Sequence, residues 1–202
     1  GLVYASISGF GQDGPLADRP GFDQIAQGMG GLMSITGEPG QGPMRVGIPI
    51  ADLCAGLFAA QAVFIALLER VKSGKGQWVQ TSLLQAQAFM LDFQAARYLM
   101  DGDVPKQAGN NHPTSIPTGV FKTSDGYINM AVAGELIWQR LAETLEKPEW
   151  CDDERFSVNE ARSKNRDILN AEIEKITKTQ TSAYWVSTLN QAGVPAGDIN
   201  DI

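Results

Sequence analysis

One acidic residue, Asp52, has surroundings that suit chemistry at an activated carbonyl carbon. Asp52 follows Pro49 and directly precedes an apolar run, so we expect it to be the N-cap of a helix. As a cap, its carboxylate would only accept backbone N–H bonds and stabilise the helix by about 1 kcal/mol. Alternatively, the helix N-terminus would favour the anion, which could attack an acyl carbon. The spacing does not separate these interpretations.

Three further residues could have either a structural role or a role in a functional site. Asp23 either caps a short helix predicted over 23–33 or, as a second carboxylate near the first, raises one pKa and holds a proton. The only histidine, His112, lies in the Gly-Asn-Asn-His-Pro loop over 109–113. It is most simply a polar surface residue, although the loop combines flexibility with several hydrogen-bond donors. Glu135 opens a predicted helix and is most simply a favourable first-turn charge.

Composition and spacing argue against several other functions. A net charge of −7 argues against a nucleic-acid surface. One histidine gives no metal site, and no Ser-His-Asp or Cys-His spacing is present. Cys54 and Cys151 lie far apart in sequence, which fits reduced thiols in a cytoplasmic protein. No signal peptide is visible, and the interrupted apolar run over 53–68 predicts a buried helix rather than a membrane span.

The elements that must position these residues fall into two predicted domains of an α/β chain. Residues 1–106 predict a strand, the long helix opened by Asp52, a second strand and a second helix. Apolar runs and helix stop signals place them over 2–7, 52–73, 77–83 and 84–100.

A stretch rich in Gly, Asn and Pro over 104–117 indicates a domain boundary, which we place between residues 106 and 107. Residues 107–202 then predict a smaller α+β domain. A hairpin joins strands over 119–123 and 127–133, and helices follow over 135–145, 163–177 and 182–192.

Six segments, in order and over almost the whole chain, resemble class III (CaiB/BaiF-type) CoA-transferases, the superfamily of formyl-CoA transferase and α-methylacyl-CoA racemase. They span residues 6–15, 21–27, 46–52, 74–77, 109–113 and 122–127. The resemblance implies part of a Rossmann-like large domain followed by the smaller domain. It also implies that the chain is an internal fragment, whose opening strand pairs with upstream neighbours. We therefore expect the 202 residues alone to be inactive.

The resemblance also assigns roles to residues. The family's catalytic aspartate falls on Asp52, and its second acidic residue falls on Asp23. The family's mobile glycine-rich loop falls on Gly109, Asn110, Asn111 and His112, at the start of the smaller domain. Phe22, Gln27 and Glu135 are candidates for lining the site.

The chemistry implied is transfer of CoA from an acyl-CoA to a carboxylic acid, without cofactor or metal. Asp52 would form a mixed anhydride with the acyl group, and CoA thiolate would then convert it to an aspartyl-CoA thioester. Asp23 would orient or protonate groups around these intermediates. By resemblance, the partners are the acyl-CoA and acid substrates and a second copy in an interlocked dimer, with no nucleic acid and no membrane.

Two other functions remain open from the sequence. The racemases of this superfamily use a His–Asp pair, and their histidine falls on Phe22, which cannot accept a proton. The racemase interpretation therefore loses its second base. In a third interpretation, the chain is a catalytically silent structural or acyl-CoA-binding module.

Overall fold

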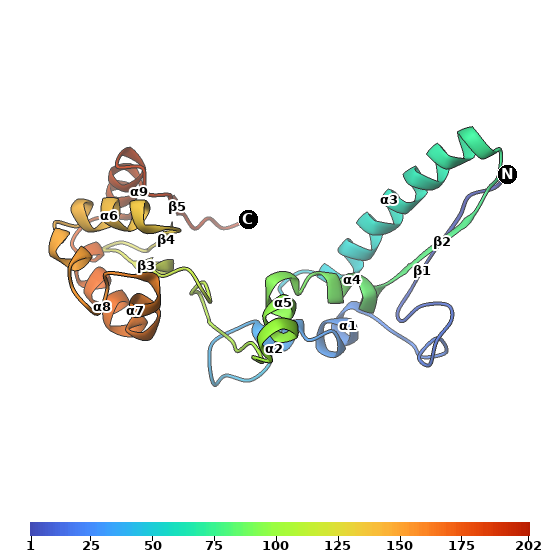
Figure 1. The fold of residues 1–202 in the computed structure, drawn as a ribbon, viewed down its shortest axis with the longest axis horizontal. Coiled ribbons are helices and arrows are strands. Elements are labelled where there is room, and N and C mark those ends of the chain that lie inside the picture. The colour runs from blue at the N-terminus through green and yellow to red at the C-terminus, as the bar shows by residue number, and fades with distance from the viewer. The chain divides into compact units, whose positions relative to one another are not determined.

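The computed structural model describes residues 1–202, which form two compact units, Gly1–Gly109 and Asn110–Ile202 (Figure 1). The sequence-based boundary, between residues 106 and 107, lies close to this division. Both units combine helices with strands, as the predicted α/β class requires. Each unit is described by itself below.

The first unit is built on two parallel strands joined by a long helical crossover. Strand β1 (Tyr4–Ser8) pairs in parallel with β2 (Trp78–Ser82), residue for residue from one end to the other. A parallel pair needs a crossover connection of a dozen or more residues, usually helical. Here the crossover contains α1 (Asp23–Met29), α2 (Leu32–Ile35) and α3 (Ile50–Ser73), and α4 (Leu83–Phe89) and α5 (Asp92–Asp101) follow β2.

Helix α3 ends as the sequence predicts but is much less buried than predicted. Gly74 adopts a left-handed conformation (φ 68°) and donates its N–H to the Arg70 carbonyl, which closes the helix. Only small side chains are buried, namely Ala51, Cys54, Ala55, Ala59 and Ala66. Large apolar side chains on the other faces are exposed, so the prediction of a buried helix is wrong. The reason is that α1, α4, β1 and β2 pack on one side of α3 only.

The exposed side chains of α3 include Leu57, Phe64 and Leu68, each about two-thirds exposed. By length and composition alone, α3 could cross a membrane. A single helix of this kind is weak evidence for a membrane span.

Three predicted helices are each divided in the structure. The helix predicted over 23–33 breaks at Gly30–Gly31, where Gly31 has φ 87° and separates α1 from α2. The helix predicted over 84–100 breaks before Asp92, whose φ is 45°. The helix predicted over 163–177 forms α7 (Asn159–Lys164) and α8 (Arg166–Thr177), separated at Asn165.

The second unit has a three-stranded antiparallel sheet and helices around one core. Strands β3 (Thr118–Lys122) and β4 (Tyr127–Ala131) form the predicted hairpin, and β5 (Ala196–Asp198), which was not predicted, pairs with β4. Helices α6 (Glu135–Thr144) and α9 (Ser182–Gln191) begin at the predicted residues, and a short 3₁₀ turn, η1, covers Pro148–Cys151.

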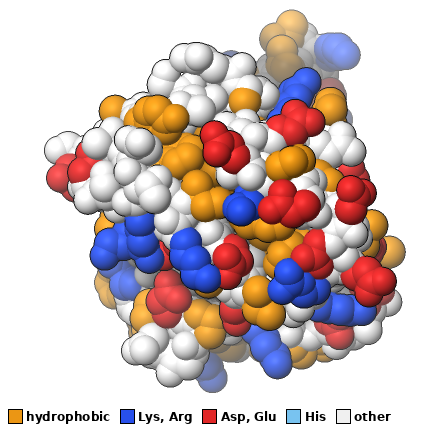
Figure 2. Space-filling model, turned by 90° about the vertical axis from the view of Figure 1, so that its left-hand side faces the viewer, with side chains coloured by type: hydrophobic (Ala, Val, Ile, Leu, Met, Phe, Trp, Pro, Cys, Tyr) orange, Lys and Arg blue, Asp and Glu red, His pale blue; other side chains and the backbone are white.

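The core of this unit joins the sheet to its helices. Fully buried side chains include Phe121 and Ile128 from the sheet, Trp138 from α6, and Leu169 and Ile173 from α8. Figure 2 shows the face of the molecule on the left of Figure 1, where basic and acidic side chains alternate.

Candidate active site

The N-terminus of α3 is held by a carboxylate from another helix. Asp23, the first residue of α1, is 7% exposed, and its Oδ1 accepts the backbone N–H of Ala51 at 2.8 Å. Its Oδ2 accepts the Gln27 Nε2 amide at 2.7 Å and lies 3.7 Å from a guanidinium nitrogen of Arg45. The first turn of a helix has backbone N–H groups without intrahelical partners, and Asp23 satisfies one of them. Asp23 therefore caps α3 across 28 residues of sequence.

Gln27 fixes the chain segment that leads into α3. Its side chain is fully buried. Its Nε2 also donates to the Ile48 carbonyl at 3.3 Å, and its Oε1 accepts the Val46 N–H at 2.9 Å. A buried amide with partners on both its oxygen and its nitrogen holds one orientation. Gln27 and Asp23 thus determine together where α3 begins.

Asp52 is not the N-cap, so this part of the sequence prediction is wrong. Helix α3 begins two residues earlier, Pro49 occupies the N-cap position, and Asp52 lies in the first turn. The Asp52 side chain is exposed and makes no hydrogen bond or ion pair. The capping contact that the sequence assigned to Asp52 is made by Asp23, at the adjacent residue Ala51. Asp52 lies in the first turn of α3, at the positive end of the helix dipole.

Phe22 is the N-cap residue of α1 and has an extended backbone. Its ring is 75% exposed and contributes no hydrogen-bonding group. The cysteines offer no alternative nucleophile, because burial raises the pKa of the Cys54 and Cys151 thiols and so disfavours the thiolate. No cluster of three or more His, Cys, Asp or Glu side chains could hold a metal ion.

The predicted glycine-rich loop straddles the boundary between the two units. Gly109 closes the first unit in a left-handed conformation (φ 57°) and donates its N–H to the Gly37 carbonyl. Asn110, Asn111 and His112 open the second unit. The His112 N–H donates to the Thr118 carbonyl at 2.8 Å, which lays the loop along β3.

Glu135, which is half exposed, forms an ion pair with the buried Arg162 in the second unit. Its carboxylate accepts two hydrogen bonds, at 2.8 and 3.1 Å, from the guanidinium of Arg162, which is 1% exposed. Arg162 also donates to the Ile116 and Phe156 carbonyls and lies over the Trp138 ring, 4.8 Å from its centroid. These contacts give Glu135 a structural role in this unit, beyond the favourable first-turn charge predicted.

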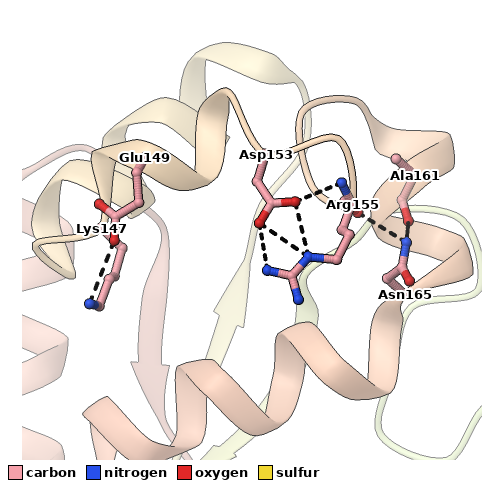
Figure 3. A network of polar contacts seen from close by, with 6 residues as sticks. All are labelled: Lys147, Glu149, Asp153, Arg155, Ala161 and Asn165. Atoms are coloured by element: carbon pink, nitrogen blue, oxygen red, sulfur yellow. Dashed lines mark hydrogen bonds and ion pairs between the residues drawn. The ribbon is translucent and has the colours of Figure 1, made fainter.

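A second polar network in this unit lies among residues 147–165 (Figure 3). Arg155 donates to both oxygens of Asp153, which lowers the pKa of that carboxyl. Asn165 donates its Nδ2 to the carbonyls of Arg155 and Ala161. None of these side chains was a candidate site residue.

The structure brings some of the candidates together. In the first unit, Asp23 and Gln27 are hydrogen-bonded to each other and to the backbone at the start of α3, next to Asp52. In the second unit, Asn111 and His112 lie in the loop, and Glu135 contacts that unit's buried Arg162. Sequence reasoning missed Arg45, whose only signal is its position within the segment before α3.

The first unit is therefore an α/β crossover unit in which a carboxylate in the first turn of a long helix has no hydrogen-bond or ion-pair partner. A family model described as CoA-transferase family III matches residues 1–202, and the chain belongs to that family.

Curated relatives and solved structures agree with this membership. The chain is 40% identical to a succinate–glutarate CoA-transferase of Agrobacterium fabrum, over all of this chain and 50% of that protein. It is 36% identical to an acetyl-CoA:oxalate CoA-transferase of Acetobacter aceti, over 100% and 52% of the two chains. A CaiB/BaiF family protein from Brucella suis matches with a TM-score of 0.84 and 40% identity, over 99% of this chain and 53% of that one. The chain thus spans about half the length of the curated relatives it matches.

Proposed function

We propose that the intact protein transfers CoA from an acyl-CoA thioester to a carboxylic acid, with Asp52 as the nucleophile. One observation carries the proposal: the Asp52 carboxylate is exposed in the first turn of α3 and has no partner, while Asp23 caps the helix. A carboxylate used for capping would have to leave its amide partners before it could attack. The names of the relatives, which are CoA-transferases, support the same reaction class.

The proposed reaction begins with attack by an Asp52 oxygen on the thioester carbonyl carbon. The carbon–sulfur bond breaks, which releases CoA thiolate and leaves a mixed anhydride on Asp52. The thiolate then attacks the Asp52 carbonyl carbon, which releases the donor acid and leaves an aspartyl-CoA thioester. The acceptor carboxylate reverses both steps. Exclusion of water from the two intermediates conserves the energy of the thioester.

Asp23 and Gln27 act in this scheme by positioning. Both oxygens of Asp23 accept hydrogen bonds from N–H groups, and Gln27 holds the segment before α3. Together they fix the first turn of the helix from which Asp52 attacks. A reacting group that is misplaced by about 1 Å can lose about 10²-fold in rate, so this positioning matters. The resemblance assigns the loop over 109–112 the role of covering the thioester.

A racemase is disfavoured by Phe22, whose exposed ring cannot accept a proton. We propose further that the intact protein is a cytoplasmic homodimer, interlocked as the resemblance implies. The exposed apolar side chains on α3, among them Leu57 and Phe64, support a partner on that helix.

The substitution Asp52→Asn in the intact protein tests the proposal. Asn has nearly the shape of Asp but is not a carboxylate nucleophile, so transfer should be abolished while the circular dichroism spectrum is unchanged. Glu69→Gln is the matched control, because Glu69 is an exposed carboxylate on the same helix. Transfer by Asp52→Asn at a rate close to that of the control, with deamidation excluded by mass spectrometry, would refute the assignment.

A further inference from the structure

Arg45 places a positive charge beside the start of α3. It lies in the segment that leads into this helix and is the only Lys or Arg among residues 20–69. One terminal guanidinium nitrogen of Arg45 lies 3.7 Å from Asp23 Oδ2, while Asp23 Oδ1 accepts the Ala51 N–H. A single carboxylate therefore separates the guanidinium from the amide of the residue that precedes Asp52. All of these residues belong to the first unit.

The ion pair with Asp23 leaves the guanidinium largely unengaged. An N–H···O hydrogen bond has a donor–acceptor distance of about 2.7–3.2 Å. The contact at 3.7 Å is therefore a charge attraction without a hydrogen bond. Both oxygens of Asp23 already accept hydrogen bonds, from Ala51 and Gln27. The Arg45 side chain is 44% exposed, so its N–H donors are available to a ligand.

The backbone on both sides of Arg45 is fixed, so its side chain starts from a defined place. The Met44 N–H donates to a carbonyl of α2 at 3.2 Å, and the Val46 N–H donates to the buried Gln27 side chain at 2.9 Å. The next residue, Gly47, is open to its surroundings, because a Cβ there would meet no atom within 4 Å. A ligand can therefore approach this segment without displacing protein atoms.

Arg45 and Asp52 are not paired with each other, although both lie at the start of α3. The ion pair of Arg45 is with Asp23, and the Asp52 carboxylate has no partner. Such a site suits a substrate with two anionic groups, one that reacts at Asp52 and one that binds the cation. A dicarboxylic acid meets this requirement, because it keeps one free carboxylate both as the acid and as its CoA thioester. The planar fork of a guanidinium binds a carboxylate through two parallel hydrogen bonds.

We propose that Arg45 is a specificity-determining residue, which binds the carboxylate that does not react, so that the protein favours dicarboxylic over monocarboxylic acids. This inference rests on the proposed function and names its substrate class. Asp23 holds the guanidinium beside α3 by charge before the substrate binds. The substrate carboxylate then supplies the hydrogen bonds that Asp23 does not make.

The test uses the intact protein with Arg45→Met, which removes the charge, and Arg45→Lys, which keeps the charge without the fork. Lys72→Met is the control, because Lys72 is an exposed cation in the last turn of the same helix. Acceptors are compared in pairs of equal chain length, succinate with butanoate and glutarate with pentanoate. The donor is acetyl-CoA or butyryl-CoA, since neither has a free carboxylate. Urea midpoints check that each variant is folded.

The parent should show a higher kcat/KM for each dicarboxylic acid than for its monocarboxylic partner. In Arg45→Met, kcat/KM for the dicarboxylic acids should fall by about 10- to 100-fold, as expected for lost hydrogen bonds to a charged group. The monocarboxylic acids should change by less than about threefold, and the KM for the donor should stay within about twofold. Arg45→Lys should recover part of the loss, and Lys72→Met should behave like the parent.

Equal losses on both classes of acid would show that Arg45 only supports the structure, and would overturn the inference. A parent that prefers the monocarboxylic acids would overturn it as well. The phosphate groups of CoA are the other anions in the reaction. A raised KM for the donor, with unchanged kinetics for the acids, would assign Arg45 to a CoA phosphate and contradict the proposal.

Calorimetric titration with glutarate measures carboxylate binding without reference to activity. Binding to the parent should weaken by about tenfold or more in Arg45→Met and stay unchanged in Lys72→Met. Absence of CoA transfer by the parent would overturn the proposed function. Glutarate binding that Arg45→Met weakens would then still support a carboxylate site at Arg45, whereas unchanged binding, or none to the parent, would refute it.

Discussion

Removal of the Asp23 carboxylate tests whether the start of α3 is held from α1. Asp23→Ala deletes the acceptor for the Ala51 N–H and for the Gln27 amide, and both donors are buried. Asp23→Asn keeps an oxygen for Ala51 but turns an NH₂ group toward the Gln27 NH₂ group. Gln27 cannot simply rotate in response, because its oxygen already accepts the Val46 N–H.

The size of the effect follows from these contacts. A buried donor without a partner costs about 1–3 kcal/mol. Gln27 Nε2 keeps its longer hydrogen bond to the Ile48 carbonyl, so the cost of losing its bond to Asp23 lies at the low end of this range. The Arg45 pair, at 3.7 Å and with Arg45 nearly half exposed, contributes at most about 1 kcal/mol. We therefore expect Asp23→Ala to lower the free energy of unfolding by about 2–4 kcal/mol, and Asp23→Asn by about 1–2 kcal/mol.

Urea unfolding of the intact protein measures these losses, and hydrogen exchange at Ala51 localises them. Asp18→Ala is the control, because Asp18 is an exposed carboxylate in the same connection between β1 and α1. A loss in Asp23→Ala no larger than in Asp18→Ala, or unchanged exchange at Ala51, would refute the capping argument.

Three further predictions concern other parts of the chain. The hydrogen bond from the Ser182 N–H lowers the pKa of Asp125 in the folded state. The ionised Asp125 carboxylate therefore stabilises the fold above its unfolded-state pKa, and this stabilisation is lost as the pH falls through the lower folded-state pKa. Urea midpoints should show that Asp125→Asn is less stable than the parent near neutral pH and equal to it in strong acid. With a 2-methylacyl-CoA in heavy water, the intact protein should exchange the α-proton no faster than a protein-free control, because Phe22 is not a base; rapid deuterium incorporation without CoA transfer would favour an isomerase. Arg162→Met should lower the free energy of unfolding by about 2–4 kcal/mol, because Glu135 and two backbone carbonyls lose their donor; a loss below about 0.5 kcal/mol would contradict this.

Local signals predicted much of the fold. The Ser-Asp-Gly turn and its flanking apolar alternation predicted the hairpin of β3 and β4, and Gly74 predicted the end of α3. The exposed faces of α3 could not be predicted, because an apolar run does not show how many elements cover it. Strand β5 was missed because it has only three residues, Ala196–Asp198, and pairs with a strand far away in sequence.

The candidate site was predicted in part. The sequence predicted Asp52 and Asp23 as candidate site residues, but it also predicted that Asp52 caps α3. The error arose because a cap can come from any acceptor that the fold brings near, here from α1. The hydrogen bonds from Arg166 to the His112 and Pro113 carbonyls, and from Asn170 to the Asn111 side chain, were also missed. The spacing of the two donor residues on one helical face was available, but polar residues at helical spacing usually indicate a solvated surface.

The central claim is that Asp52 carries the acyl group and then CoA. The most direct measurement is mass spectrometry of the intact protein, quenched in acid after mixing with an acyl-CoA and no acceptor acid, followed by peptide mapping. We predict a CoA thioester on the peptide that contains Asp52, absent from Asp52→Asn and present in Glu69→Gln. An adduct on another residue, or none while CoA transfer proceeds under the same conditions, would contradict the assignment of Asp52 as the nucleophile.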